Sequence, residues 1–413
     1  MSKKRIVIVG GGFAGLAALR EMSHVDAEIT VIDTRSSQVF QPLLFLVATC
    51  GVSGDDVESP IRAFINGKRN IRFIQDEVTA INVQDKFVTT SQNGSVPFDY
   101  VLVTCGAQSN FFGMTDVAAN AMGLKDTQEA IHIRNKILTQ LERATLTEDE
   151  DERRRLLTFV VVGGGPTGVE VAGSMAELLF NGLGKYYPTL SKKDITLYLL
   201  EGMGNLLPQV KPKEQEKAKK WLESLGVTVC LHTMMSGYDG KTVTIKDKDS
   251  IDTEVVIWGA GVCASSLIKT LGLEQGHAGR LIVRPTLQVK DVDYVFTAGD
   301  TAHYEPSPGA RPLPMTAAVA MQSGTAAGKN IVRLLNGQAL ENFSYTDKGT
   351  LCVVANGKAV GLIKGHSLAG WFCWFLWAGA HIWLPFASHI KWSLNWKFIW
   401  NHFSKTLPNR NQS

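Results

Sequence analysis

The chain has few cysteines and, towards its end, no acidic residues. Its 413 residues include six cysteines, and no two of them form a CxxC pair. This spacing suggests neither a paired redox disulfide nor a zinc site, so we expect no metal. No Asp or Glu follows Asp347, whereas residues 348–413 carry seven Lys or Arg, and seven of the nine tryptophans lie after residue 370. A basic, Trp-rich tail favours a membrane surface; its basic residues are too sparse and its apolar content too high for nucleic acid.

The chain also lacks a secretory signal before its first apolar run. It begins with Lys3-Lys4-Arg5 and then reads directly as a strand. We therefore expect the catalytic part to be cytosolic. A length of 413 residues predicts two or three domains with sizeable cores.

What the sequence does contain is two glycine-rich turns that follow apolar runs. Residues 6–15 read IVIVGGGFAG, and residues 159–168 read FVVVGGGPTG. Each run predicts a parallel strand that is buried on both faces. Each turn predicts a helix N-terminus that binds a pyrophosphate. The sequence therefore predicts an α/β protein with two Rossmann-like dinucleotide-binding domains, which together hold two nucleotides.

Each glycine of the first turn has a different structural role. Gly10 permits the tight turn, Gly12 lets the backbone approach the pyrophosphate, and Gly15 lets the helix pack closely on the strand. Asp33 closes the next strand, at the position of a ribose-binding carboxylate. The alternative is an ordinary βαβ unit in which Asp33 is a solvated loop acid.

The second turn repeats the arrangement with Gly163, Gly165 and Gly168, and the next strand ends in Glu201. A carboxylate there accepts hydrogen bonds from a ribose 2′-hydroxyl and repels a 2′-phosphate, which favours NADH over NADPH. Nearby basic side chains could override this preference. A further apolar strand over 255–261 is the counterpart of the strand over 100–106.

These patterns suggest three domains. We predict a first dinucleotide-binding domain over 1–113 and 263–340, a second over 114–262, and a C-terminal membrane-association region over 341–413. A helix is predicted from Thr316 to Leu335, and short strands over 341–363. The charged run at 148–155 is interpreted as a solvated helix end or linker.

The tail holds two apolar segments. Residues 368–387 have His381 as their only ionisable side chain and could just span a bilayer core of about 30 Å, although Pro385 and several glycines favour an interfacial or re-entrant segment. Residues 388–403 predict an amphipathic helix. Its apolar face carries Trp392, Trp396, Ile399, Trp400 and Phe403. We expect residues 368–403 to hold a peripheral (monotopic) protein on the cytoplasmic face of the membrane. The alternatives are a packed core helix or the interface of a homodimer.

Together these motifs resemble the type II NADH:quinone oxidoreductases, single-chain FAD enzymes among the flavoproteins with two dinucleotide-binding domains. The likeness covers nearly the whole chain. Its more specific motifs are Phe40-Gln-Pro-Leu-Leu44 with Val47-Ala-Thr49, Gly165-Pro-Thr-Gly-Val-Glu170, and the basic tail that begins Lys364-Gly-His366.

The resemblance implies FAD on the first domain, NADH as substrate on the second, and transfer of two electrons to a membrane quinone without proton pumping. The FAD residues implied are Gly10, Gly12, Gly15, Asp33, Gly106, Asp300 and Lys364. The NADH residues implied are Gly163, Gly165, Gly168, Glu201, Gly259 and Gly261.

Two residues are candidates for the chemistry at the quinone. Glu170 is the candidate for proton relay or quinone positioning; alternatively it is a helix-dipole and capping carboxylate. Gln322 matches one of two family glutamines near the quinone, and Ala318 replaces the other. The alternative for Gln322 is a helix-surface amide. Phe45 and Leu46 also depart from the family pattern, which makes the expected quinone pocket more apolar.

Two other functions remain open. A sulfide:quinone oxidoreductase shares the fold and a membrane tail, but needs cysteines that face the flavin. The intact second turn with Glu201 argues for a nicotinamide instead. A membrane-tethered redox-sensing or binding flavoprotein with little turnover is the other class. The cysteines available to the first alternative are Cys50, Cys105, Cys263 and Cys352.

Overall fold

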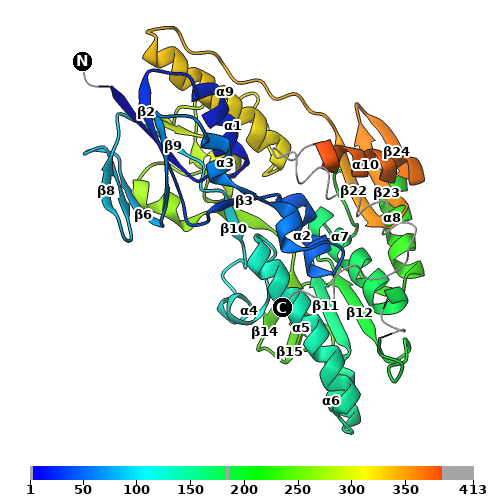
Figure 1. Cartoon of the computed structure of the whole chain (residues 1–413). Helices are drawn as coiled ribbons and strands as arrows, with labels where there is room; N and C mark the ends of the chain where they lie inside the picture. The colour runs from blue at the N-terminus through cyan, green and yellow to red at the C-terminus, as the bar shows by residue number, and fades with distance from the viewer. Residues whose placement is uncertain (1–2, 183–185, 384–413) are drawn as a thin grey trace. The chain divides into compact units, whose positions relative to one another are not determined.

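The computed structural model describes residues 3–182 and 186–383, which form two compact units (Figure 1). Unit 1 comprises Met1–Val39, Ser59–Gln108 and Val262–Asp347. Unit 2 comprises Phe40–Glu58, Ser109–Gly261 and Lys348–Ser413. Compared with the predicted domains, the segment Phe40–Glu58 and the C-terminal part both group with the second dinucleotide-binding unit.

Unit 1 is built on a five-stranded parallel sheet with the order β20-β9-β1-β2-β5. Its central strand is the predicted apolar run, in which Ile6 to Val9 are buried. The return of the chain for the last strand is confirmed, because β20 pairs with β9. The strands are β1 Lys4–Val9, β2 Ala27–Asp33, β5 Ile71–Gln75, β9 Tyr100–Val103 and β20 Val295–Thr297.

Two helices of unit 1, α1 (Phe13–Met22) and α9 (Ala317–Leu335), pack with their backbones in close approach. A Cβ on Gly324 would lie 2.2 Å from the carbonyl oxygen of Ala14, and one on Gly328 would lie 2.6 Å from that of Ala18. Only glycine permits this contact. The predicted helix over 316–335 is confirmed, since Thr316 caps α9 by accepting from the N–H of Val319 at 3.4 Å.

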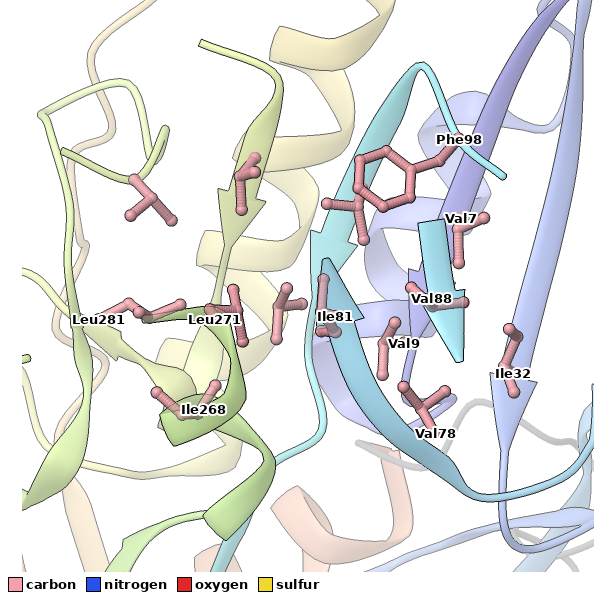
Figure 2. Close-up of a cluster of buried hydrophobic side chains, with 14 of the residues drawn as sticks. Val7, Val9, Ile32, Val78, Ile81, Val88, Phe98, Ile268, Leu271 and Leu281 are labelled. Atoms are coloured by element: carbon pink, nitrogen blue, oxygen red, sulfur yellow. The ribbon is translucent and has the colours of Figure 1, made fainter. Parts of the chain in front are cut away.

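A core cluster of unit 1 joins the sheet to an antiparallel sheet and a 3-10 helix (Figure 2). Val7, Val9 and Ile32 come from the central strands, Val88 and Phe98 from the antiparallel part, and Ile268 and Leu271 from the 3-10 helix. These elements are β6 Val78–Asn82, β7 Phe87–Thr90, β8 Gly94–Pro97 and η5 Ser266–Leu271. Shorter elements that lie mainly in unit 1 are β3 Ser37–Val39, β4 Glu58–Pro60, α3 Ile61–Ile65, β10 Ala107–Ser109, β18 Val262–Ala264, η6 His277–Gly279, β19 Leu281–Ile282, η7 Gly299–Thr301 and β21 Ala302–His303.

Unit 2 is built on a parallel sheet with the order β13-β12-β11-β17. The strands are β11 Thr158–Val162, β12 Thr196–Leu200, β13 Val227–Cys230 and β17 Val256–Trp258. The helices are η1 Gln41–Leu43, α2 Leu44–Ala48, η2 Gly54–Val57, α4 Thr115–Asn120, α5 Thr127–Leu146, α6 Glu150–Leu156, α7 Pro166–Ala176, the π-helix η3 Glu177–Gly182 and α8 Pro212–Ser224. An antiparallel sheet of β14 Met235–Tyr238, β15 Thr242–Ile245 and β16 Ile251–Asp252 contributes to its core.

The C-terminal part of unit 2 is a three-stranded antiparallel sheet followed by a helix. The elements are β22 Thr350–Ala355, β23 Lys358–Ile363, β24 His366–Gly370 and α10 Trp371–Trp383. The strands predicted over 341–363 are confirmed from Thr350 onwards. Gly173 of α7 lies against β22 so closely that a Cβ there would be 1.7 Å from the Val354 carbonyl oxygen.

The apolar stretch predicted over 368–387 is not one continuous segment, because its first residues close β24 and the helix begins at Trp371. In the described ranges, no helix combines the length and apolar character needed to cross a bilayer. The predicted amphipathic helix over 388–403 lies outside the described residues.

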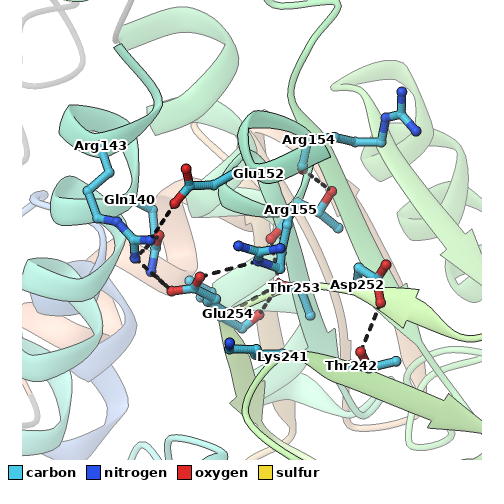
Figure 3. Close-up of polar contacts among 12 residues, drawn as sticks. Gln140, Arg143, Glu152, Arg154, Arg155, Lys241, Thr242, Asp252, Thr253 and Glu254 are labelled. Atoms are coloured by element: carbon cyan, nitrogen blue, oxygen red, sulfur yellow. Dashed lines mark hydrogen bonds and ion pairs between the residues drawn. The ribbon is translucent and has the colours of Figure 1, made fainter. Parts of the chain in front are cut away.

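The charged run at 148–155 is more than a solvated linker. Residues 150–156 form α6, and Arg155 from this helix reaches the carboxylate of Glu254 at 3.3 Å (Figure 3). Arg143 of α5 bonds the other carboxylate oxygen at 2.8 Å, and Lys136 lies 3.5 Å from it. The Glu254 side chain is 12% exposed, so the run supplies part of a half-buried ion-pair cluster.

Candidate active site

The first glycine-rich turn, in unit 1, has the geometry its sequence predicts. Gly10 has a φ of +103°, and a Cβ there would lie 2.3 Å from the carbonyl oxygen of Thr104. A Cβ on Gly15 would lie 2.0 Å from the carbonyl oxygen of Gly10. By contrast, a Cβ on Gly12 would meet nothing within 4 Å, and this residue starts α1 without a side-chain cap. The turn therefore presents backbone N–H groups to open space, as a pyrophosphate requires.

The acid expected beside this turn is tied to it. Asp33 ends β2 and accepts a hydrogen bond from the N–H of Gly11 at 2.7 Å through Oδ2. Its Oδ1 accepts from the N–H of Arg35 at 2.9 Å. These bonds fix the carboxylate at the carboxyl end of the sheet, where a ribose is bound in such folds.

The other residues assigned to FAD follow neighbouring strands or lie in unit 2. Gly106 comes after β9 with a φ of +73° and open space around it. Asp300 follows β20 in η7, and its charge acts on the buried guanidinium of Arg280. Since β9 and β20 pair in parallel, both residues lie at one edge of the unit 1 sheet. Lys364 belongs to unit 2, where it is exposed in the turn between β23 and β24.

The second turn, in unit 2, repeats the first. Gly163 has a φ of +109°, and a Cβ there would lie 2.6 Å from the backbone of Gly259. A Cβ on Gly168 would lie 1.8 Å from the carbonyl oxygen of Gly163. Gly165 faces open space and starts α7 without a side-chain cap. Gly259 and Gly261 follow β17, so the loop after this strand lines the turn.

Glu201 repeats the role of Asp33. It follows β12, and its Oε2 accepts from the N–H of Gly164 at 2.5 Å. Its Oε1 accepts from the N–H of Met203 at 2.6 Å. Each oxygen retains room for a further bond, because a carboxylate accepts about four hydrogen bonds.

Glu170 is half-buried as a residue, and its carboxyl group lies inside unit 2. It lies beyond the first turn of α7, which holds no acid, so the capping alternative does not describe it. Burial raises the pKa of its carboxyl to about 8, against the lowering effect of hydrogen bonds from the Val353 N–H and the Trp377 side chain. The Val353 bond measures 3.4 Å. Glu170 is therefore a neutral, proton-carrying group near pH 7.

Aromatic residues from both ends of unit 2 gather near this carboxyl. The ring of Trp377 lies 4.4 Å from that of His381 and 6.1 Å from that of Phe45. Phe40 meets His381 edge-on at 6.2 Å. The Nδ1–H of His381 donates to the carbonyl oxygen of Trp377 at 2.8 Å, and burial lowers the pKa of this imidazole to about 4. Sequence reasoning selected Phe45 and the tail, but missed that Trp377 reaches Glu170.

The side chain of Gln322 forms two hydrogen bonds with the backbone of Thr346. Its Nε2 donates to the carbonyl oxygen of Thr346 at 3.0 Å, and its Oε1 accepts from the N–H of Thr346 at 3.0 Å. Ala318 lies one turn earlier on the same helix and is half-buried. Gln322 thus anchors the segment after α9 within unit 1, and its contact with a quinone stays a prediction.

Comparison with known proteins decides the family. Over 396 residues, the chain is 35% identical to the type II NADH:quinone oxidoreductase NdhA of Mycobacterium tuberculosis, and the match spans 92% of this chain and 83% of that protein. The chain belongs to the type II NADH:quinone oxidoreductases. A Staphylococcus aureus member is 29% identical over 89% of this chain and 92% of its own length. Residues 4–324 also match the pyridine nucleotide-disulphide oxidoreductase family.

Solved structures agree on the fold. NDH2 from Plasmodium falciparum, solved in complex with NADH, superposes with a TM-score of 0.90 over 98% of this chain and 99% of that one, at 22% identity. The sulfide:quinone oxidoreductase of Aquifex aeolicus reaches 0.72 at 14% identity, over 98% and 93% of the two chains. These likenesses show a shared fold. The sequence-based assignment to the type II family and to its α/β fold is confirmed.

Three of the four candidate cysteines do not favour the sulfide alternative. Burial raises the pKa of Cys105 to about 12 and holds that of Cys352 well above its ordinary value. Burial also raises the pKa of Cys50. Sulfur chemistry at a flavin needs a thiolate, which these environments disfavour.

Proposed function

We propose that this protein oxidises NADH and passes two electrons through FAD to a membrane quinone, without proton pumping. The observation that carries the proposal is the repetition of one constellation in two units: a glycine turn, a helix start without a side-chain cap, and a carboxylate bonded to the turn. Each constellation suits the ADP half of a dinucleotide. A protein with two of them can bind a redox cofactor and a nucleotide substrate.

FAD fits the turn of unit 1, because the space beside Gly12 admits a pyrophosphate and Asp33 is placed for a ribose. Gly106 and Asp300 extend the same edge, and Lys364 is the residue assigned by family likeness. When bound, FAD supplies a carrier that accepts a hydride and gives up electrons. The protein's own part is to bind and orient it.

NADH fits the turn of unit 2. Glu201 would accept a hydrogen bond from the 2′-hydroxyl of the adenosine ribose, and its charge would oppose the 2′-phosphate of NADPH. Gly163, Gly165 and Gly168 would admit the pyrophosphate at the start of α7. Gly259 and Gly261 would line the pocket beyond it.

Glu170 would hold a proton for the quinone, which takes up two protons on reduction. Its carboxyl is neutral near pH 7 because it is buried, so it can donate a proton where an exposed glutamate could not. Trp377 and the Val353 N–H fix its position. Gln322 is the second residue proposed at the quinone, with Ala318 one turn away.

A membrane surface fits one face of α10. Trp371, Phe372 and Phe375 are 57–59% exposed on this helix, whereas Cys373 and Trp377 are buried. Exposed aromatic side chains next to a basic tail favour an interfacial position. We therefore propose a peripheral protein on the cytoplasmic face that binds the membrane through residues 368–403.

The spectrum of the purified protein tests the function. We expect a yellow protein whose flavin absorbance disappears on anaerobic addition of NADH and returns on addition of a lipophilic quinone. Reduction by sulfide but not NADH would favour the sulfide enzyme. Reduction by NADH without reoxidation by quinone would favour a sensor. A folded protein unable to take up FAD would refute the proposal.

A further inference from the structure

Large apolar side chains are exposed at two main places in the described part of the chain. One is α10, and the other is the carboxyl edge of the unit 2 sheet. At this edge Phe112 is 63% exposed, Met203 68% and Met234 58%. Among these side chains, Phe112 lies beside the loop that follows β17.

Phe112 is held at this edge in a strained conformation. Its φ is +51°, in the left-handed region that a bulky residue rarely adopts. The side-chain oxygen of Asn110 accepts a hydrogen bond from the Phe112 N–H at 3.0 Å. The carbonyl oxygen of Asn110 accepts a hydrogen bond from the indole Nε1–H of Trp258 at 2.9 Å. The backbone N–H of Asn110 donates to the carbonyl oxygen of Gly261 at 3.1 Å. Such strain persists only where the surroundings enforce it, and it is common at ligand sites.

The ring lies against the loop that lines the second glycine turn. A Cβ on Gly261 would be 3.2 Å from Cζ of Phe112, and the Phe112 ring is centred 6.3 Å from that of Trp258. The preceding residues of the loop meet the turn itself, since a Cβ on Gly163 would be 2.7 Å from the Cα of Ala260. A continuous set of contacts therefore joins the exposed ring to the turn.

The position of Phe112 relative to the strands of the sheet indicates which end of the dinucleotide would lie near its ring. β12, which leads to Glu201, and β17, which leads to Gly261, flank β11 on opposite sides. The acid after β12 takes the adenosine ribose and the turn takes the pyrophosphate. The other half of the dinucleotide then extends towards β17, where Phe112 lies.

We propose that the exposed ring of Phe112 is the platform against which the nicotinamide end of NADH packs. This inference rests on the proposed function of the second turn. It makes Phe112 a positioning residue for the hydride donor, because a planar ring restrains the planar nicotinamide by stacking. Met203, which follows Glu201, belongs to the opposite, adenosine side.

The test uses the FAD-loaded protein and two ligands that cannot reduce it: tetrahydro-NADH, and ADP-ribose, which lacks the nicotinamide. Binding is measured by calorimetry for the unmodified protein, Phe112→Ala and Phe112→Gly. We expect both variants to bind tetrahydro-NADH about 3- to 10-fold more weakly and ADP-ribose within about 2-fold of the unmodified protein. Gly accepts the positive φ, so agreement between the variants shows that the ring, and not loop strain, is responsible.

Glu201→Gln serves as the matched variant on the other side. It should weaken both ligands alike, since both contain the adenosine ribose. If the Phe112 variants bind both ligands more weakly, or bind both as tightly as the unmodified protein, the role of Phe112 as a platform is overturned. The nucleotide site itself would still stand. An unmodified protein that binds neither ligand would overturn the proposed function, and the platform with it.

Discussion

The backbone N–H of Gly164 donates a hydrogen bond to Oε2 of Glu201 at 2.5 Å. This bond couples the residue proposed to select the ribose to the turn proposed to receive the phosphates. A second bond, from the Met203 N–H, restrains the other oxygen. The carboxylate is thus oriented before any nucleotide arrives, which lowers the cost of ordering it on binding.

Replacing Glu201 with Gln should therefore raise the KM for NADH. Loss of a charged hydrogen bond costs about 1.5–3 kcal/mol, which corresponds to roughly 10- to 150-fold. The ratio of kcat/KM for NADH to that for NADPH should fall as well, because the charge that opposes a 2′-phosphate is gone. Glu223→Gln, on the surface of α8, is the control and should leave both values unchanged. A natural preference for NADPH would contradict the assignment.

Glu170→Gln should change how stability depends on pH. The folded pKa of about 8 lies above the ordinary value of 4.5. From pH 4.5 to 8 the unfolded chain loses this proton while the folded protein keeps it, so the free energy of unfolding falls as pH rises. Gln cannot ionise, and the variant should gain stability relative to the unmodified protein over this range. Denaturant unfolding at pH 5 and pH 8 measures the difference; a constant difference would contradict the burial of the carboxyl.

The same variant should slow the reaction with quinone. Removal of a positioned proton donor typically costs about 100-fold or more. Stopped-flow reoxidation of the reduced flavin by a lipophilic quinone should show this loss, whereas flavin reduction by NADH should be unchanged. The reverse pattern would place Glu170 in the NADH half-reaction.

The helix that carries Gln322 offers a separate test. Gln322→Ala removes two hydrogen bonds to Thr346 and should destabilise the protein by about 1–2 kcal/mol, measured by denaturant unfolding. Ala318→Gln breaks none of these bonds and lies on the same face. If this face meets the quinone, Ala318→Gln should alter quinone reoxidation only. Slower flavin reduction by NADH with unchanged reoxidation would refute both assignments.

The Glu254 cluster should support unit 2. Burial tends to raise the pKa of Glu254, but hydrogen bonds from Arg143 and Gln140 bring it to about 2. Glu254→Gln should cost about 1–3 kcal/mol of stability at pH 7. The difference should shrink as pH falls from 4.5 towards 2, because the unfolded chain then binds a proton that the native carboxylate does not take up until about pH 2. Asp151→Asn, in an exposed pair with Arg154, is the control and should change the free energy of unfolding by less than about 0.5 kcal/mol.

The exposed face of α10 should bind lipid. Substituting Trp371, Phe372 and Phe375 together with Ser should reduce co-sedimentation with anionic vesicles and leave the flavin spectrum unchanged. Point substitutions are preferable to truncation, since the same helix buries Trp377. Leu146→Ser is the control, because Leu146 is 82% exposed on α5. Dissociation of a dimer, with vesicle binding intact, would show that this face joins two copies instead.

The sequence predicted the parts whose signal is local. The apolar runs, both glycine turns and the closing acids Asp33 and Glu201 follow one another at short range, and the structure forms each as predicted. The helix over 316–335 was predicted from its helical pattern. The break at Trp371 was missed, because strand β24 ends inside an apolar stretch and only pairing with β23 defines it.

The contacts that were missed join distant segments. The burial of Glu170 depends on Val353 and Trp377, and neither has a signal near residue 170. Glu254 likewise pairs with cationic side chains from α5 and α6, so the run EDEDERRR, taken alone, predicted only a solvated helix end or linker. Phe112 carries no motif; only its exposure and positive φ mark it.

The close contact of α1 with α9 has a consequence for how the protein is made. Glycines 324 and 328 complete unit 1 against a helix that leaves the ribosome near the start of translation. At roughly 5–20 residues per second, the apolar face of α1 waits tens of seconds for its partner. Unit 2 is also completed late, because β22 can cover α7 only after residue 355 has been added. Unit 1 is therefore complete only after α9 has been synthesised, so a finished site for FAD forms late in translation.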